Sequence, residues 1–268
     1  MSLLIHSMGE FESVILPALD IVKPQQMVEI GSEHGGLTTL VNQWGCDNGA
    51  HLTSVDPAPS KTFRHWASSA TSFTHVEKPS LEAFDQLANV DVWFIDGDHN
   101  WYTVYHELQN VHAHCQRDKK PMLAFLHDVG WPNGRRDSYY QPDRIPEQFR
   151  HPFSYDEGVT LGVPGMINGG FRGLGQFAYA RQEGGERNGV LTAVEDFASP
   201  FGDAFALAVI PAVFGMGVLF SKDAPWAADL VTHLMPYHQN SLLHSLEINR
   251  LKNYLRVIEM QDQASARP

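Results

Sequence analysis

The sequence predicts an α/β fold with a doubly wound, mostly parallel sheet of seven strands, in which the last strand is antiparallel. In the first half of the chain, short apolar runs alternate with segments of helical periodicity, which is the pattern of βαβ units. Farther on, FALAVIPAVFGMGVLFSK contains two apolar runs that follow each other too closely for a helical crossover. These two runs are expected to form an antiparallel hairpin.

Five strands are expected in the first half of the chain. A helix from 9 to 22 precedes them, because apolar residues recur there at helical spacing until Lys23 and Pro24 end the pattern. The strands are expected at 27–31, 51–56, 74–77, 92–95 and 122–126, and the other helices at 37–44, 62–70, 81–87 and 100–117.

A long segment without periodicity separates the fifth strand from the hairpin. Between residues 130 and 200, glycine, proline, arginine and tyrosine dominate, which in a compact domain is typical of a functional loop or lid. We therefore expect a large insertion between strands five and six that folds over a bound ligand.

The end of the chain is predicted to be helical over residues 225–262. Ile248, Leu251, Leu255 and Ile258 form one apolar stripe in this segment. The stripe fits packing on the protein's own sheet, which we favour, and it also fits a dimer seam, so a homo-oligomer is left open. All elements fit one domain of residues 1–268.

Composition limits the classes of partner. The chain has 268 residues, of which 43% are hydrophobic, and its net charge of -12 argues against nucleic acid. The two cysteines, Cys46 and Cys115, lie far apart without zinc-site spacing and are expected to be buried thiols. No apolar run reaches the roughly 20 residues of a membrane span, and MSLLIHSMGEF lacks a basic leader region. We therefore expect a cytoplasmic protein that binds a small molecule and no membrane.

A glycine-containing turn follows the first predicted strand. In VEIGSEHGGLTTL, glycines at a strand-to-helix turn let backbone amides approach a ligand. Asp56 ends the next strand, where a carboxylate can accept both hydroxyls of a ribose. Together the two features predict a nucleoside site; the alternative is a tight turn followed by an aspartate that caps the next segment.

A dinucleotide is the less favoured ligand for this turn. The dinucleotide pattern G-x-G-x-x-G is absent, and Glu33 would place a negative charge beside a pyrophosphate. NAD and FAD are therefore not expected.

Acids and histidines follow two neighbouring strands of the predicted sheet. DVWFIDGDH ends in Asp96, Asp98 and His99, and PMLAFLHDV ends in His127 and Asp128. Because ligands of open α/β sheets bind beyond the carboxyl ends of the strands, these side chains are expected to share one crevice. The alternative is a group of ordinary, solvated strand-end acids together with a helix cap.

These motifs carry a family resemblance. EIGSEHGG, VDP, FIDGDH and LHD resemble class I S-adenosylmethionine-dependent methyltransferases, and the antiparallel final hairpin fits that Rossmann-like fold. The DGDH and HD pair is similar to small-molecule O-methyltransferases that act on sugars, several of which use a divalent metal. The resemblance covers roughly residues 25–130 and the hairpin; the insertion, on the acceptor side, is not covered.

The resemblance implies a set of cofactor-binding residues. Gly31 and its neighbours would cradle the methionine part of S-adenosyl-L-methionine, Glu29 would support the turn, and Asp56 would hold the ribose. Residues 79–81, with Ser80 among them, would flank the adenine. The full predicted set is Glu29, Gly31, Ser32, Gly35, Gly36, Asp56, Ser80 and Asp96. Glu33 takes the place of the middle glycine in the commoner E-x-G-x-G-x-G pattern, which leaves the turn geometry open.

The acids at the two strand ends predict a cation site. Mg²⁺ prefers carboxylate oxygens, and Asp96 and Asp128 could hold it. His127 is the third candidate ligand, although metal-using relatives more often carry an acid there, so Mn²⁺ or a water ligand stays open.

Two residues are candidates for the general base. His99 comes first, because an ordinary histidine titrates near neutral pH and could take the proton of a hydroxyl. Asp98 comes second, and its alternative role is to cap the helix that opens at Asn100.

The insertion opens with side chains suited to a polar ligand. Arg135, Arg136, Tyr139 and Tyr140 combine guanidinium groups with aromatic rings, which suits sugar rings or a phosphate. The alternative for Arg136 is local pairing with Asp137.

The predicted function is S-adenosylmethionine-dependent O-methylation of a small molecule, a sugar or glycoconjugate, with metal assistance left open. Two alternatives stand beside it. A nucleotide-dependent oxidoreductase would use a related sheet to bind NAD(H), and a non-catalytic cofactor-binding partner subunit would tolerate substitution of Asp96, His99 and Asp128.

Overall fold

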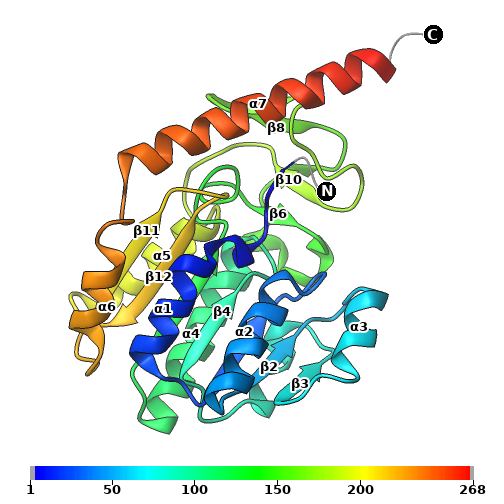
Figure 1. Cartoon of the computed structure of the whole chain (residues 1–268). Coiled ribbons are helices and arrows are strands. Elements are labelled where there is room, and N and C mark those ends of the chain that lie inside the picture. The colour runs from blue at the N-terminus through cyan, green and yellow to red at the C-terminus, as the bar shows by residue number, and fades with distance from the viewer. Residues whose placement is uncertain (1–3, 266–268) are drawn as a thin grey trace.

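The computed structural model describes residues 4–265, and a seven-stranded sheet forms its centre (Figure 1). The strand order is β11-β12-β5-β4-β1-β2-β3. Strands β1 to β5 run parallel, and β12 is antiparallel to both β5 and β11. The predicted fold class is confirmed. The strands are β1 (Gln26–Ile30), β2 (His51–Val55), β3 (Phe73–Val76), β4 (Val92–Ile95), β5 (Leu123–His127), β11 (Phe205–Ile210) and β12 (Met216–Ser221).

Two apolar clusters, one on each face, enclose the sheet. One cluster contains side chains of α1 (Glu12–Val22), α2 (Gly36–Asn48) and α6 (Ala227–Leu234), and the other contains those of α4 (Trp101–Asp118) and α5 (Val190–Ala198). Successive residues of β4 join opposite clusters, because side chains alternate along a strand. This explains why β4 and β5 are continuous apolar runs with both faces buried.

The shorter helices depart from the prediction at one place. The helix expected at 81–87 is instead a pair of 3-10 turns, η2 (Ser80–Glu82) and η3 (Phe84–Gln86). The remaining short helices are η1 (Met8–Phe11), α3 (Lys61–Ala67), η4 (Pro142–Arg144), η5 (Glu147–Phe149) and η6 (Ser199–Phe201).

The turn of the final hairpin has an unusual backbone. Three consecutive residues, Val213, Phe214 and Gly215, have φ angles of 45°, 64° and 90°. The left-handed region costs glycine little, but a β-branched residue there is a genuine outlier, with a cost of about 1–3 kcal/mol. The surrounding structure must therefore hold this turn in place.

The insertion between β5 and β11 has structure of its own. It contains a three-stranded sheet, a two-stranded hairpin and α5. Its strands are β6 (Ser138–Tyr139), β7 (Phe153–Ser154), β8 (Gly158–Thr160), β9 (Val163–Ile167) and β10 (Ala178–Ala180). In Figure 1, the part of this segment that contains β6, β8 and β10 lies between the sheet and the last helix, whereas α5 packs on one face of the sheet.

Buried polar side chains organise the insertion, which corrects part of the prediction. Arg136 is 1% exposed and donates to the carbonyl oxygens of Ala180 and Pro164, so it is neither a ligand-binding group nor the partner of Asp137. Asp137 accepts hydrogen bonds from the Trp101 amide and from the Tyr139 hydroxyl. Arg135 pairs with Glu195 at the surface instead. Of the four side chains proposed for ligand recognition, Arg135, Arg136 and Tyr139 thus form hydrogen bonds within the protein. Tyr140 stays a candidate for binding a ligand.

The last helix, α7 (Ser241–Ser265), lies across the insertion (Figure 1). Its buried Leu251 belongs to a small apolar cluster that also contains Leu4 and Phe214, and the Arg172 guanidinium pairs with the Asp262 carboxylate at 2.6 Å. The predicted packing on the protein's own sheet therefore holds for α6 and for Leu243 at the start of α7, whereas the stripe residue Leu251 lies elsewhere. The stripe of α7 meets the insertion and the hairpin turn, because an amphipathic pattern indicates a buried face without specifying the partner.

Candidate active site

The turn after β1 packs directly against the turn after β4. Gly31 has a φ of 87°, and a Cβ atom added there would lie 2.2 Å from the Asp96 carbonyl oxygen. Only glycine fits this backbone conformation and this close approach. The two motifs that the sequence singled out therefore meet through their main chains.

Asp56 binds the glycine turn with one of its carboxylate oxygens. Its Oδ2 accepts from the backbone amides of Ser32 and Glu33, at 2.9 and 3.0 Å, and from the Ser32 hydroxyl at 3.2 Å. Within the described residues 4–265, its Oδ1 accepts from the Ala58 amide alone, at 2.7 Å. Since a carboxylate oxygen has two lone pairs, Oδ1 retains capacity for a further donor such as a ribose hydroxyl. The ribose assignment stays a prediction.

Replacing Asp56 with asparagine is expected to weaken binding of S-adenosylhomocysteine by about tenfold to a hundredfold. Asparagine has one accepting oxygen, so in either orientation its NH2 group faces the Ser32 and Glu33 N–H groups or the Ala58 N–H group and leaves a donor unpaired, at about 1–3 kcal/mol. Calorimetric titration measures the change, and Asp203→Asn, at a side chain that is 94% exposed, is the matched control. Equal affinity in both variants would show that the Asp56 carboxylate does not shape the cofactor site.

Glu29 ties the end of β1 to the start of α2. Its Oε2 accepts a 2.6 Å hydrogen bond from the Thr38 hydroxyl, and burial raises its pKa to about 8. Gly35 is the N-cap of α2 with a φ of 83°, and a Cβ on Gly36 would lie 2.6 Å from the Ser7 hydroxyl oxygen. The predicted cofactor turn is thus held from both ends.

Four side chains at the ends of β4 and β5 form one group, which we call the strand-tip cluster: Asp96, His99, His127 and Asp128. The His99 Nε2 atom lies 3.5 Å from Asp96 Oδ1 and 3.3 Å from Asp128 Oδ2. The His127 Nδ1 atom lies 3.2 Å and 3.3 Å from the same two oxygens. The structure thus brings both predicted metal-binding acids, the predicted third ligand and the first-choice base together.

The charges within the strand-tip cluster shift the pKa of every member. Burial acts to lower the pKa of His99, but Asp128 and Asp96 outweigh it and raise it to about 9. The pKa of His127 is also raised, because the same two acids outweigh its burial. Both aspartates have lowered pKa values, because the histidines outweigh the effect of burial. Without a cation, His99 is therefore protonated at neutral pH, unlike the near-neutral histidine that the sequence predicts.

The donor atoms of the strand-tip cluster suit a divalent cation. One ligand atom each from Asp96, His99 and Asp128 lies within 4.8 Å of the others. The His99 Nε2 atom is buried and has no hydrogen-bond partner within residues 4–265. Two carboxylate oxygens and two imidazole nitrogens are a ligand set that Mn²⁺ and similar metals accept. These residues therefore fit a metal ion.

Asp98 points to a different place from the strand-tip cluster. Its Oδ2 accepts from the Thr103 hydroxyl at 3.1 Å, and burial raises its pKa. The cap of α4 is Asn100, whose side chain accepts from the Thr103 amide. Deeper along α4 lies Glu107, which Ser80 approaches from η2. The predicted adenine-flanking serine thus lies beside a buried acid.

Two residues of this region, Asn133 and Val213, were missed at the level of sequence, whereas Tyr140 was among the side chains predicted to suit a polar ligand. Asn133 donates to Asp128 Oδ1 at 3.1 Å, and the ring of Tyr140, which is 47% exposed, meets the His99 ring edge-on at 6.0 Å. The Val213 carbonyl oxygen lies 2.8 Å from His127 Nε2. Asn133 lies in the segment without periodicity and Val213 in the turn of the predicted hairpin, and no local signal indicates that either approaches the strand-tip cluster.

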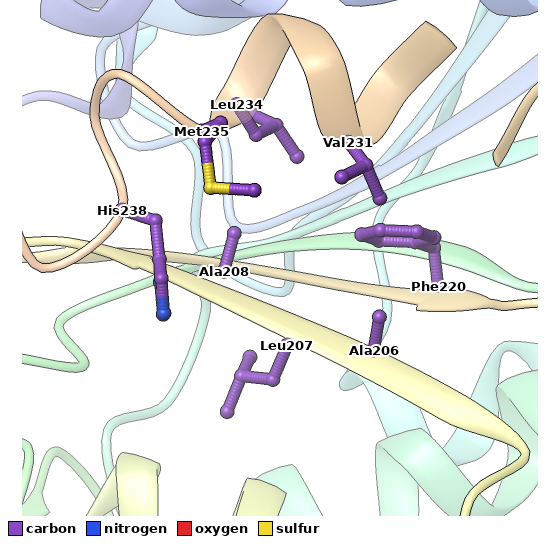
Figure 2. A pocket seen from close by; sticks show the side chains of 8 residues that line it. All are labelled: Ala206, Leu207, Ala208, Phe220, Val231, Leu234, Met235 and His238. Carbon is purple, nitrogen blue, oxygen red and sulfur yellow. The ribbon is translucent and has the colours of Figure 1, made fainter. Parts of the chain in front are cut away.

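Away from the strand-tip cluster, a cavity of about 160 Å³ lies between β11 and α6 (Figure 2). Apolar side chains such as Leu207 and Phe220 line it, and His238 stands at its edge. No residue of the strand-tip cluster contributes to it, and its lining offers no acid or nucleophile.

Comparisons with known proteins give one family match and a set of similar solved structures. Residues 28–128 match the family model described as a methyltransferase domain. Among solved structures, the methyltransferase PaMTH1 of Podospora anserina, bound to S-adenosylhomocysteine, has 13% sequence identity and a TM-score of 0.47, with 80% of this chain and 78% of that chain covered. An O-methyltransferase from Bacillus cereus, in complex with the same molecule, has 10% identity and a TM-score of 0.48, with 81% and 82% covered.

No curated protein matches the chain by sequence. Within residues 4–265, no helix is both long and apolar enough to span a membrane. The matched segment contains the glycine turn and the strand-tip cluster. The chain therefore contains a methyltransferase domain, matched over residues 28–128, in agreement with the resemblance that its motifs carry.

Proposed function

We propose that the protein transfers the methyl group of S-adenosylmethionine to a hydroxyl of a sugar or glycoconjugate, with a divalent cation at the strand-tip cluster. One observation carries the proposal. The glycine turn and the strand-tip cluster touch where Gly31 packs on the Asp96 carbonyl, so a methyl donor on the turn would face an acceptor bound beside the cluster.

The cofactor would lie across the tips of β1, β2 and β4. Gly31 and Ser32 would receive its methionine part, Asp56 its ribose and Ser80 its adenine. Support comes from the narrow backbone contact at Gly31 and from the hydrogen-bonding capacity left on Asp56 Oδ1.

Asp96, Asp128 and His127 would hold the cation, and Asn133 would orient Asp128. A bound divalent cation supplies a Lewis acid that makes an acceptor hydroxyl more acidic. The chain's own residues bind and orient that hydroxyl at the two strand tips. A positive charge at the cluster also opposes the proton on His99, and this lowers the pKa of its imidazole from about 9 toward the working range of a base.

His99 is the favoured base over Asp98. Its Nε2 atom lies within the strand-tip cluster, next to Asp128, where an acceptor hydroxyl would be held. Asp98 is instead engaged with Thr103 at the start of α4.

The acceptor would enter beneath the insertion. The half-exposed ring of Tyr140 stands beside His99 and contacts the ring of Phe177 at 5.6 Å, which offers an aromatic face for a sugar ring. A cytoplasmic location and a homo-oligomeric state both stay predictions from the sequence.

The test is calorimetric titration with S-adenosylhomocysteine, with and without Mg²⁺, and with NADH as the control ligand. We expect binding of S-adenosylhomocysteine in the micromolar range and none of NADH. A protein that binds NADH alone would be an oxidoreductase. Binding of S-adenosylhomocysteine without methyl transfer to any hydroxyl compound of a sugar panel would favour the non-catalytic subunit.

A further inference from the structure

The two ring nitrogens of His127 have different partners. The Val213 carbonyl oxygen lies 2.8 Å from Nε2, and a carbonyl can only accept, so Nε2 carries a proton and donates it. Nδ1 faces Asp96 Oδ1 and Asp128 Oδ2. The carbonyl of Val213 therefore decides which nitrogen of His127 is left for a cation.

The carbonyl that makes this choice belongs to the strained hairpin turn. Val213 has a φ of 45° and Phe214 a φ of 64°, both in the region that disfavours residues with side chains. Such a conformation persists only where neighbouring groups hold it. Its supports can be identified on two sides.

On one side, Glu247 of α7 accepts hydrogen bonds from the backbone of the turn. Its two carboxylate oxygens accept from the Val213 amide at 3.0 Å and from the Phe214 amide at 2.9 Å. Arg250 donates to the same two oxygens at 2.6 and 2.7 Å, and its guanidinium stands 4.7 Å from the centre of the Phe214 ring. Glu247 is 8% exposed, so this pair is shielded from water.

On the other side, the turn touches the chain just after Asp128. The Phe214 carbonyl accepts from the Gly130 amide at 2.6 Å, and a Cβ on Gly130 would lie 2.5 Å from that carbonyl oxygen. The turn thus lies between the end of β5 and α7, with hydrogen bonds to both.

We propose that Glu247 is a positioning residue for the strand-tip cluster. By holding the Val213–Phe214 turn, it keeps the Val213 carbonyl on His127 Nε2 and so presents His127 Nδ1 to a cation between Asp96 and Asp128. The inference rests on the cation site of the proposed function. It gives the carboxyl-terminal helix, which touches neither cofactor nor acceptor, a role in the chemistry.

The experiment compares Glu247→Ala and Glu247→Gln with Asp262→Asn. The last variant removes the ion pair that ties α7 to Arg172 but leaves the turn untouched, so it controls for looser docking of the helix. The first readout is the affinity for Mn²⁺ alone, measured by calorimetry without cofactor or acceptor. The second is the solvent exchange of the His127 Nε2–H proton, measured by NMR.

We expect Glu247→Ala to bind Mn²⁺ about 10–100-fold more weakly, as is usual when the partner that orients a metal-binding histidine is lost. Glu247→Gln should lose less, because its amide oxygen still accepts from the turn, and Asp262→Asn should bind like the wild type. Adding Val213→Gly to Glu247→Ala should restore part of the affinity, because glycine adopts the turn conformation without strain.

Unchanged Mn²⁺ affinity in Glu247→Ala would overturn the inference, and so would an equal loss in Asp262→Asn. If the wild-type protein bound no Mn²⁺, the proposed cation site would fail on its own account. The proton exchange would then still decide the role of Glu247: faster exchange in Glu247→Ala than in Asp262→Asn supports it, and equal exchange contradicts it.

Discussion

Replacing Asp128 with asparagine is expected to lower kcat by at least about a hundredfold, within the range that a positioned acid–base group contributes. The Asp128 carboxylate lies 3.3 Å from both His99 Nε2 and His127 Nδ1, so its charge supports both imidazoles at once. Asparagine keeps the shape and removes the charge. The proposed cation loses a ligand, and the buried histidines lose a counter-charge.

The measurement is the formation of S-adenosylhomocysteine with a hydroxyl compound that the wild-type protein methylates, together with calorimetric Mn²⁺ binding. Asp203→Asn, at a side chain that is 94% exposed, is the control and should act like the wild type. Binding of S-adenosylhomocysteine should change less than twofold in Asp128→Asn. Full turnover in that variant would contradict both the cation site and the choice of His99 as base.

The free energy of unfolding is expected to fall as the pH rises from about 5 to 8, because Glu107 keeps a proton in the folded state. Burial raises its pKa to about 8, and the neighbouring Ser80 side chain opposes this shift only in part. The unfolded chain releases this proton near the usual pKa of about 4.3. Between these values the folded state binds more protons, so its stability decreases by up to about 1.4 kcal/mol per pH unit.

Glu107→Gln removes this ionisation, and its stability should therefore depend less steeply on pH than that of the wild type. Urea unfolding curves at several pH values across this range measure the slope. Glu186→Gln, at an exposed side chain, should leave the slope unchanged. Glu29 has a similarly raised pKa and should add to the effect. His99, whose pKa is about 9, also keeps a proton in the folded state in the upper part of this range, so the comparison with Glu107→Gln is what isolates Glu107. Equal slopes in the two proteins would mean that Glu107 is ionised in the folded state.

The sheet was predictable because its signal is local and strong. Both β4 and β5 are short runs of apolar residues with acids at their ends, and burial on both faces explains this pattern. The strand-tip cluster followed from the same fact, since parallel strands end at one edge of the sheet. Asp96 and Asp128 could therefore be placed together without any knowledge of side-chain geometry.

The remaining parts of the site depend on contacts at that edge of the sheet between segments that lie far apart in the sequence. Glu247 lies on an outer helix, and nothing in its neighbourhood along the chain indicates contact with the turn at Val213. Arg136 has the residue type of a ligand-binding group, yet its side chain is buried in the insertion and donates to the carbonyl oxygen of Ala180. Residue type states what a side chain can bind, whereas its partner is settled by tertiary packing.

The contact at Gly31 has a consequence for engineering the enzyme. Because the turns after β1 and β4 meet through main-chain atoms, substitution of side chains in the insertion leaves the spacing between them unchanged. The insertion lies outside the matched segment and supplies Tyr140. Exchanging insertions between related chains would therefore alter which molecules are accepted while preserving the alignment of donor and nucleophile.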